Sequence, residues 1–255
     1  MISRIRAKLK RDGIFGLTIA IIKYPFTLRR RNEYRGMLTL NSPKERFSEI
    51  YKKNLWSSAE SVSGVGSEIL YTEPLREWLI ENINLLKIKT FVDAPCGDFN
   101  WIKLVLPKVD INYIGLDIVD SIIEQNKVIY ASDNIKFEIA NICEDRLPDC
   151  DIIMVRDCLF HLSNEDINKF LINLSKTDYK YLLTTTHKVD KTFKNSNIKT
   201  GDFRLIDLFS FPFYFVSTKV KSRVEDFPTG YSIKRQMILV EKKFVPTKIL
   251  DFSSN

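Results

Sequence analysis

The sequence is poor in the residues that build metal, disulfide and dinucleotide sites. It has two histidines and four cysteines among 255 residues, and no two cysteines form a Cys-x-x-Cys pair. We therefore expect no metal site and a reduced, intracellular protein with free thiols. Its nine glycines nowhere form the Gly-x-Gly-x-x-Gly of a dinucleotide-binding turn. This absence disfavours NAD and FAD as cofactors.

A broad surface of one charge is also missing from most of the chain. Residues 1–36 carry ten basic and two acidic residues, whereas the other 219 residues carry 29 basic and 30 acidic ones. The net charge of +7 therefore belongs to one tail. A near-neutral body argues against nucleic acid as a partner, because binding to phosphate backbones needs a concentrated basic face.

The basic tail contains an apolar run that is too short to span a bilayer. Residues 14–22 form an uncharged run of nine before Lys23 and Pro25, whereas a spanning helix needs about 20 apolar residues. Such a tail suits peripheral contact with an anionic membrane, in a cytoplasmic protein held at the inner face. The alternative is a helix packed on the body with a solvated charged face. We treat residues 1–40 as a basic helical extension and 41–255 as one domain.

Helical and strand patterns alternate from Thr72 onward. Helices are expected to begin at about 72, 98, 120 and 163, and strands at about 89–93, 112–117, 135–140, 151–156 and 179–185. Near-continuous apolar strands between helices predict an α/β fold with a Rossmann-like, doubly wound, mostly parallel sheet. Segments 213–221 and 232–242 are predicted to form an antiparallel C-terminal hairpin at its edge.

Two of the predicted strands end in carboxylates on either side of a glycine turn. The first ends at Asp93 and is followed by Gly97 and Asp98, and the second ends at Asp117. Glycine allows close backbone approach to a ligand, and the second carboxylate lies where ribose hydroxyls can be bound. Asp98 would repel a pyrophosphate, so the pattern favours S-adenosylmethionine, a sulfonium without phosphate. The alternative is that Asp93 ends a strand and Asp98 caps a helix.

This order of elements resembles the class I S-adenosylmethionine-dependent methyltransferases over residues 60–187 and the terminal hairpin. Four segments are similar to a bacterial branch often linked to surface-glycan pathways: Ser61-Val-Ser-Gly-Val-Gly-Ser67, Asp93-Ala-Pro-Cys-Gly-Asp-Phe-Asn-Trp101, Arg156-Asp-Cys-Leu-Phe-His-Leu-Ser163 and Leu183-Thr-Thr-Thr186. The third glycine usual in the superfamily loop is replaced by Phe99. The resemblance implies a methyltransferase with S-adenosylmethionine as its cofactor.

The resemblance also implies roles for individual residues. It assigns Asp93 and Gly97 to the methionine end of the cofactor and Asp117 to the ribose. Asn141 would bind the adenine edge, where an aspartate is commoner, and two isoleucines would lie against the ring. The expected cofactor-binding residues are Asp93, Gly97, Asp98, Asp117, Ile118, Asn141, Ile142 and Arg156.

His161 and Asp157 are the candidate catalytic residues. Both follow the fourth predicted strand, and His161 comes two residues before Ser163, the expected cap of the next helix. This position predicts a loop that faces the ligand cleft. An imidazole there can accept a proton from a hydroxyl nucleophile as methyl transfer proceeds, and Asp157 could orient it or accept the proton itself. The alternative is a partly buried histidine with satisfied hydrogen bonds.

The methyl acceptor is left open by the sequence. Residues 61–67 suit either a lid with glycine hinges or a flexible linker, and the aromatic residues 209–216 suit either core or a stacking surface. Residues 200–204 are expected to shape the acceptor pocket. We expect O-methylation of a small or glycan-type acceptor. The alternatives are a nucleic-acid methyltransferase and a non-catalytic S-adenosylmethionine-binding protein.

Overall fold

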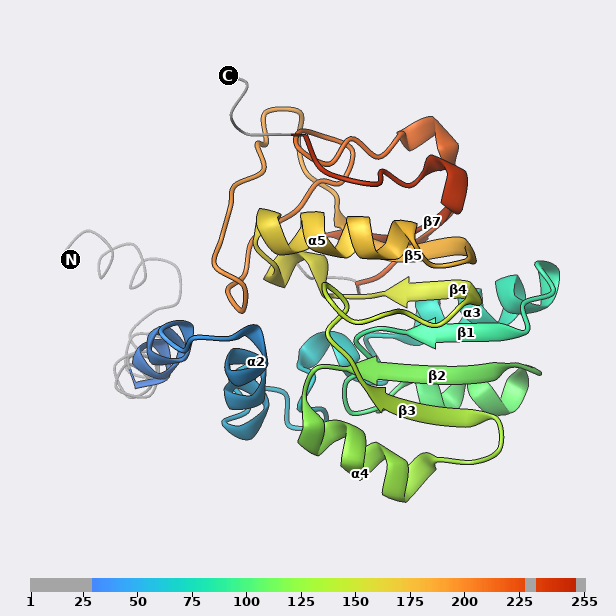
Figure 1. The fold of residues 1–255 in the computed structure, drawn as a ribbon, viewed down its shortest axis with the longest axis horizontal. Coiled ribbons are helices and arrows are strands. Elements are labelled where there is room, and N and C mark those ends of the chain that lie inside the picture. The colour runs from blue at the N-terminus through green and yellow to red at the C-terminus, as the bar shows by residue number, and fades with distance from the viewer. Residues whose placement is uncertain (1–28, 228–232, 251–255) are drawn as a thin grey trace, which may run out of the picture.

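A seven-stranded sheet in the order β3-β2-β1-β4-β5-β7-β6 forms the centre of the molecule (Figure 1). The computed structural model describes residues 29–227 and 233–250. The strands are β1 Thr90–Asp93, β2 Asn112–Asp117, β3 Ile135–Ile139, β4 Cys150–Val155, β5 Tyr179–His187, β6 Val220–Glu225 and β7 Arg235–Glu241. Strands β1 to β5 pair in parallel, and β7 runs antiparallel to both β5 and β6. The predicted doubly wound sheet with an antiparallel C-terminal pair is confirmed.

Helices cover both faces of the sheet. Beyond a helical stretch at 29–38, the α-helices are α2 Pro43–Lys52, α3 Glu73–Leu85, α4 Asp120–Tyr130 and α5 Asn164–Ser175. Consecutive side chains of a strand point to opposite faces, and β1 shows the result. Phe91 belongs to the core with Leu79 of α3, whereas Val92 belongs to the core with Phe170 of α5.

One predicted helix is replaced by tighter turns. After β1 the chain forms two 3-10 turns, Ile102–Leu104 and Leu106–Lys108, where the sequence predicts a helix that begins near Asp98. Asp98 cannot act as the expected helix cap, because its carboxylate accepts hydrogen bonds from Ser61 and the Val62 amide. The Asp98 carboxylate, which the local sequence predicts as a helix cap, is thus bound by the 61–63 segment, more than 30 residues away in sequence.

The predicted strand at 213–221 is also wrong in its position. The strand β6 begins only at Val220, and residues 209–216 form an irregular segment with a positive φ of 49° at Tyr214. Phe213 and Phe215 are buried in the core on the α5 face. Buried and exposed residues alternate here as they would in a strand. The backbone nevertheless forms a turn, in which the Phe213 amide donates to the Ser210 carbonyl.

The N-terminal elements lie at the carboxyl ends of the parallel strands. Figure 1 shows α2 beyond the arrow tips of β1 and β2. Met37 from the 29–38 helix packs with Ile50 and Leu55 in a small core of its own. Among the described residues, no helix is long and apolar enough to cross a membrane. The apolar run 14–22 lies outside the described residues, so the expected membrane contact stays a prediction.

Candidate active site

Two pockets open beside each other at the carboxyl ends of β1, β2 and β4. The first, of about 690 Å³, is lined by four residues that were expected at the adenosine: Asp117, Ile118, Asn141 and Ile142. The second, of about 880 Å³, is lined by three of those expected around the rest of the cofactor: Asp93, Gly97 and Arg156. Both pockets share the residues Tyr51, Trp56, Pro95, Asp157 and His161. The structure therefore brings together every predicted site residue except Asp98.

Asp117 ends β2 as predicted, and its carboxylate is held by backbone amides. The Gly97 amide donates to Oδ2 at 3.1 Å and the Val119 amide donates to Oδ1 at 3.0 Å. Burial raises the pKa of Asp117 to about 6, although both amide hydrogen bonds oppose the rise. Each carboxylate oxygen retains a further lone pair for a ligand hydroxyl.

Asn141 follows β3 at the edge of the first pocket. Its side-chain oxygen accepts a hydrogen bond from the Cys143 amide at 3.1 Å, which fixes the amide plane. Fixing the oxygen leaves the Nδ2 group as the donor that this side chain can offer to a ligand. Ile118 and Ile142 supply apolar surface in the same pocket.

Asp93 ends β1 and is almost fully buried beside the second pocket. The Tyr113 hydroxyl donates to its Oδ2 at 2.8 Å. Burial raises the pKa of Asp93 to about 7, and the Tyr113 hydrogen bond and the charge of Arg156 oppose the rise. The carboxylate is therefore poised to change its protonation state near neutral pH, and a cation in the pocket would favour its charged form.

Asp98 ties residues 61–63 down onto the glycine turn. The hydroxyls of Ser61 and Ser63 both donate to its carboxylate, at 2.8 to 3.0 Å. In return, the Ser63 hydroxyl accepts from the Asp98 amide at 3.0 Å. The groups that bind the Asp98 carboxylate thus all belong to the 61–63 segment. Instead of the expected contact with a cofactor, Asp98 makes contacts that hold this segment in place.

Gly97 is needed for the same close packing. Its φ is +56°, and a Cβ at this position would lie 2.2 Å from the Ser63 hydroxyl oxygen. We expected glycine here to let a ligand approach the backbone, but in the structure the crowding group is Ser63. The 61–67 segment therefore lies fixed against the turn by these contacts and forms part of the wall of the second pocket.

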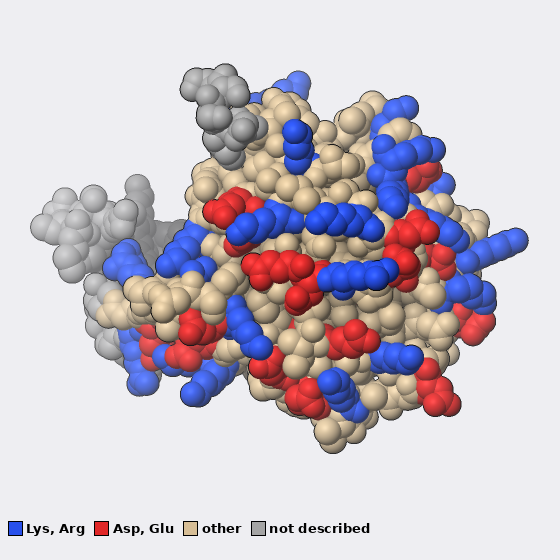
Figure 2. Space-filling view, viewed as in Figure 1, with Lys and Arg blue, Asp and Glu red and all other residues tan. Residues whose placement is uncertain are grey.

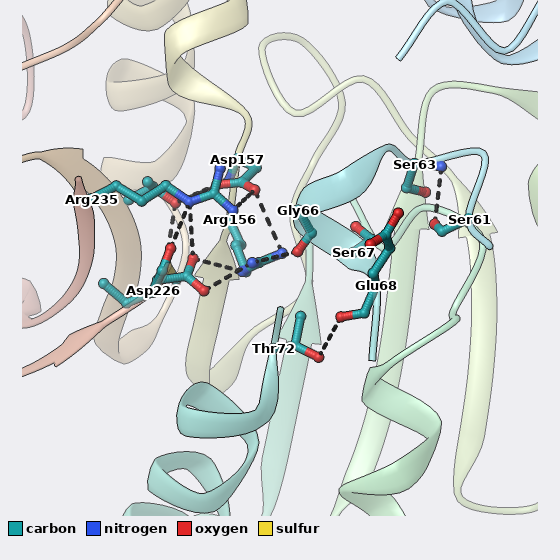
Figure 3. A network of polar contacts seen from close by, with 12 residues as sticks. Ser61, Ser63, Gly66, Ser67, Glu68, Thr72, Arg156, Asp157, Asp226 and Arg235 are labelled. Atoms are coloured by element: carbon teal, nitrogen blue, oxygen red, sulfur yellow. Dashed lines mark hydrogen bonds and ion pairs between the residues drawn. The ribbon is translucent and has the colours of Figure 1, made fainter. Parts of the chain in front are cut away.

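Arg156, Asp157 and Arg235, which line the second pocket, belong to an ion-pair network with Asp226 (Figure 3). Arg156 donates from Nε and Nη2 to the fully buried carboxylate of Asp226, at 3.0 and 2.9 Å, and from Nη2 to the Gly66 carbonyl at 2.7 Å. Arg235 contacts Asp226 and lies 2.8 Å from the Oδ2 of Asp157. Two arginines and two aspartates balance in charge.

The network determines the state of Asp157. Partial burial favours a higher pKa, but the guanidinium groups of Arg156 and Arg235 outweigh it and hold the pKa of Asp157 below its ordinary value. The residue has a φ of +51°, and Thr185 donates to its Oδ1 at 3.2 Å. Asp157 therefore stays a carboxylate at neutral pH, which disfavours it as the proton acceptor and suits it to orienting a substrate.

Asp226 and Arg235 were missed by sequence reasoning. Both flank the turn between β6 and β7, and Asp226 comes 70 residues after Arg156 along the chain. Their proximity depends on β7 inserting between β5 and β6, which no local pattern reveals. The signal in the sequence was limited to two opposite charges, Asp226 and Arg235, on either side of the turn of the predicted hairpin.

His161 lies in a 3-10 turn, Leu159–His161, on the wall between the pockets. Its Nδ1 is 2.8 Å from the backbone carbonyl of Asp202. A carbonyl only accepts hydrogen bonds, so Nδ1 carries the proton and Nε2 keeps its lone pair. Desolvation lowers the pKa of His161, against the opposing hydrogen bond to Asp202. The ring is therefore neutral at pH 7 and can accept a proton at Nε2.

Aromatic side chains surround this imidazole. The ring centroids of Trp56, Phe160 and Phe203 lie 5.2, 4.6 and 5.9 Å from that of His161. Tyr51 lines both pockets and has a pKa raised well above the ordinary value by burial. Sequence reasoning missed Tyr51 and Trp56, because Tyr51 in α2 and Trp56 just after it belong to no recognisable motif.

Comparisons with known proteins agree with this architecture. No protein-family model and no curated protein sequence matches the chain. Human N-acetylserotonin methyltransferase, solved with S-adenosylmethionine, aligns with a TM-score of 0.51 and 12% identity over 86% of this chain and 68% of its own. A Leishmania major S-adenosylmethionine-dependent methyltransferase aligns with a TM-score of 0.54 and 17% identity, over 82% and 90%. Magnesium protoporphyrin IX methyltransferase from Synechocystis, solved with S-adenosylmethionine, aligns with a TM-score of 0.54 and 11% identity, over 79% of this chain and 98% of its own. At such identities the likeness shows the fold, which is the class I methyltransferase fold.

Proposed function

We propose that this protein is an S-adenosylmethionine-dependent methyltransferase in which His161 is the general base. The observation that carries the proposal is the position of His161. Its imidazole lies on the wall shared by a pocket suited to a nucleoside and a second pocket beside it. The lone pair on Nε2 can accept the proton of a hydroxyl as the methyl group is transferred.

The residues of the first pocket fit an adenosine. Asp117 offers acceptors for two ribose hydroxyls, Asn141 offers a donor for the adenine edge, and two isoleucines supply an apolar surface. The ionisable carboxylate of Asp93 borders the second pocket and favours a positive charge there. When bound, S-adenosylmethionine supplies a methyl group activated by its sulfonium.

The protein's own contribution is alignment and removal of one proton. The amides of Gly97 and Val119 hold the Asp117 carboxylate in place, and this carboxylate would position the ribose of the cofactor. The aromatic side chains around His161 limit the access of water to the reacting hydroxyl. Alignment of two bound reactants can account for several kcal/mol of barrier, roughly 7 to 11 in favourable cases. Proton transfer to a positioned base typically contributes a further factor of about 10² to 10⁴.

We infer that the acceptor is a small or glycan-type molecule with a free hydroxyl. Trp56 and Phe203 offer apolar faces of the kind that lie against a sugar ring, and Asp157 offers a carboxylate for neighbouring hydroxyls. Nucleic acid is disfavoured as acceptor. Lys and Arg are interspersed with Asp and Glu on the face in Figure 2, without the continuous basic surface that phosphate backbones need.

The test is a methyl-transfer assay of the full-length protein on sugar, lipid-linked and nucleotide-sugar acceptors, with release of S-adenosylhomocysteine as the readout. His161→Asn keeps a donor for the Asp202 carbonyl but removes the base. We expect kcat to fall by about 10² to 10⁴ with cofactor affinity unchanged. His187→Asn, which keeps an acceptor for the Ile206 amide, is the matched control and should retain activity. Cofactor binding without turnover on any acceptor would favour the non-catalytic alternative.

A further inference from the structure

The loop 200–204 determines how His161 is oriented. Its Asp202 carbonyl accepts the hydrogen bond from Nδ1, at 2.8 Å. The same loop is fastened to the backbone around the histidine, because the Gly201 amide donates to the His161 carbonyl at 2.8 Å and the Arg204 amide donates to the Phe160 carbonyl at 3.2 Å. Any displacement of this loop would therefore move the group that selects the tautomer.

The N-terminal helices hold the loop from its other side. The Tyr34 hydroxyl, from the 29–38 helix, donates to the Gly201 carbonyl at 2.7 Å. Arg46 of α2 donates from Nη1 to the Thr200 carbonyl at 3.0 Å. These two bonds join residues 154 and 167 positions apart in sequence, and both end on the residues directly before Asp202.

Arg46 is built into the fold and is not a surface charge. It is 7% exposed, and its remaining donors bind the carbonyls of Leu40 and Asn41, each at 3.0 Å. Gly201 has a φ of +100°, and a Cβ there would lie 3.3 Å from two side-chain carbons of Arg46. The loop and the arginine thus pack with no space for another group between them.

We propose that Tyr34 and Arg46 are positioning residues, which hold the Asp202 carbonyl on Nδ1 and so keep the basic lone pair of His161 on Nε2. The 29–38 helix and α2 then contribute to the orientation of the catalytic residue through these two side chains. This inference rests on the proposed function of His161 as general base. Second-sphere groups of this kind commonly set the tautomer and orientation of a functional histidine.

Charged and titratable groups face His161 from several elements of the fold. The charged or titratable groups that face His161 are Asp157 after β4, Arg235 of β7, Asp202 of the loop and His187 at the end of β5. Burial, with help from the charge of Asp202, raises the pKa of Tyr34 to about 12. Tyr34 therefore remains a hydrogen-bond donor throughout the range in which His161 titrates.

The test compares Tyr34→Phe with wild type by ¹⁵N NMR of the histidine rings in the full-length protein, without any cofactor or acceptor. Wild type should show His161 as the Nδ1–H tautomer alone. In Tyr34→Phe we expect the two ring-nitrogen shifts to move toward each other, because both tautomers become populated. Tyr214→Phe, at a tyrosine that is 50% exposed, is the matched control and should leave the shifts unchanged.

Two further measurements separate positioning from folding. Arg46→Lys keeps the charge but cannot reach three carbonyls, and it should change the tautomer as Tyr34→Phe does. With an active acceptor, kcat should fall by about tenfold or more at an unchanged KM for the cofactor. A wild-type tautomer in a folded Tyr34→Phe would overturn the proposal. Because the tautomer is measured on the free protein, a failure to bind S-adenosylmethionine would contradict the proposed function alone.

Discussion

Asp117 is the residue on which the proposed cofactor site most depends. Two backbone amides already hold its carboxylate, so its remaining lone pairs point in fixed directions. Hydrogen bonds to a charged group are worth about 1.5–3 kcal/mol each. Asp117→Asn should therefore weaken S-adenosylhomocysteine binding by about 10- to 100-fold, as measured by calorimetry. The control is Glu138→Gln, at an exposed carboxylate of β3, which should bind as wild type does.

The raised pKa values of the two buried carboxylates predict a pH dependence of binding. The pKa of Asp117 lies at about 6 and that of Asp93 at about 7. Below these values the groups are neutral, so neither can attract a cation. Affinity for S-adenosylmethionine should rise as pH increases from 5 to 8, because binding of a cation favours the ionised forms.

The product, which lacks the sulfonium charge, is the natural control for this pH effect. S-adenosylhomocysteine lacks the sulfonium charge, so its affinity should rise less over the same range. Calorimetric titrations of both compounds at pH 5, 6, 7 and 8 measure the difference. Equal pH profiles for the two compounds would contradict a role of Asp93 in binding the sulfonium.

At this scale, the sequence predicted where residues lie in the fold more readily than which groups they contact. Asp93 and Asp117 could be placed at strand ends because each follows a local apolar run. Such runs are reliable signals for parallel strands that are buried on both faces. Asp98 was assigned to the ligand, yet its carboxylate binds the 61–63 segment, and Gly97 lines the second pocket but also packs against Ser63. Contacts between segments more than 30 residues apart are not encoded in any local pattern.

At the scale of elements, Asp226 joins β4 to the hairpin of β6 and β7. Its carboxylate is fully buried between Arg156 and Arg235. Removal of one partner from a buried ion network costs about 3–5 kcal/mol, because a charge is left unpaired. Asp226→Asn should lower the thermal unfolding midpoint by roughly 10 °C.

The neighbouring residue gives a matched control. Glu225 pairs with Lys188 through side chains that are 51% and 44% exposed, and exposed pairs contribute about 1 kcal/mol or less. Glu225→Gln should therefore change the midpoint little. A small effect of Asp226→Asn, comparable to that of Glu225→Gln, would mean that the network does not hold the hairpin in place.

The helices and parallel strands could be predicted from the sequence, whereas irregular segments could not. The sequence identified β1, β2, β4 and β5 by short apolar runs and β3 by the alternation of apolar and charged residues in Ile135–Ile139. The segment 209–216 shows the limit of this reasoning. Its Phe213 and Phe215 are buried without pairing to a strand, since burial alone does not require a strand conformation.

At the scale of the whole molecule, the site is assembled from segments spread over most of the chain. Groups from α2, the 61–67 segment, the ends of β1, β2 and β4, and the β6–β7 hairpin meet in two adjoining pockets. The sheet order explains this convergence, because the strand order reverses between β1 and β4 and opens a crevice there. The sequence predicts this crevice through its alternation of elements.

The central claim is that this crevice binds S-adenosylmethionine, and calorimetric titration of the full-length protein with S-adenosylhomocysteine tests it most directly. NAD, whose pyrophosphate the site is not built to hold, serves as the comparison. We predict saturable binding of S-adenosylhomocysteine at one site, with a Kd in the range of about 1 µM to 1 mM typical of enzyme ligands, and no binding of NAD. Absence of saturable S-adenosylhomocysteine binding up to about 1 mM, or equal binding of NAD, would contradict the account.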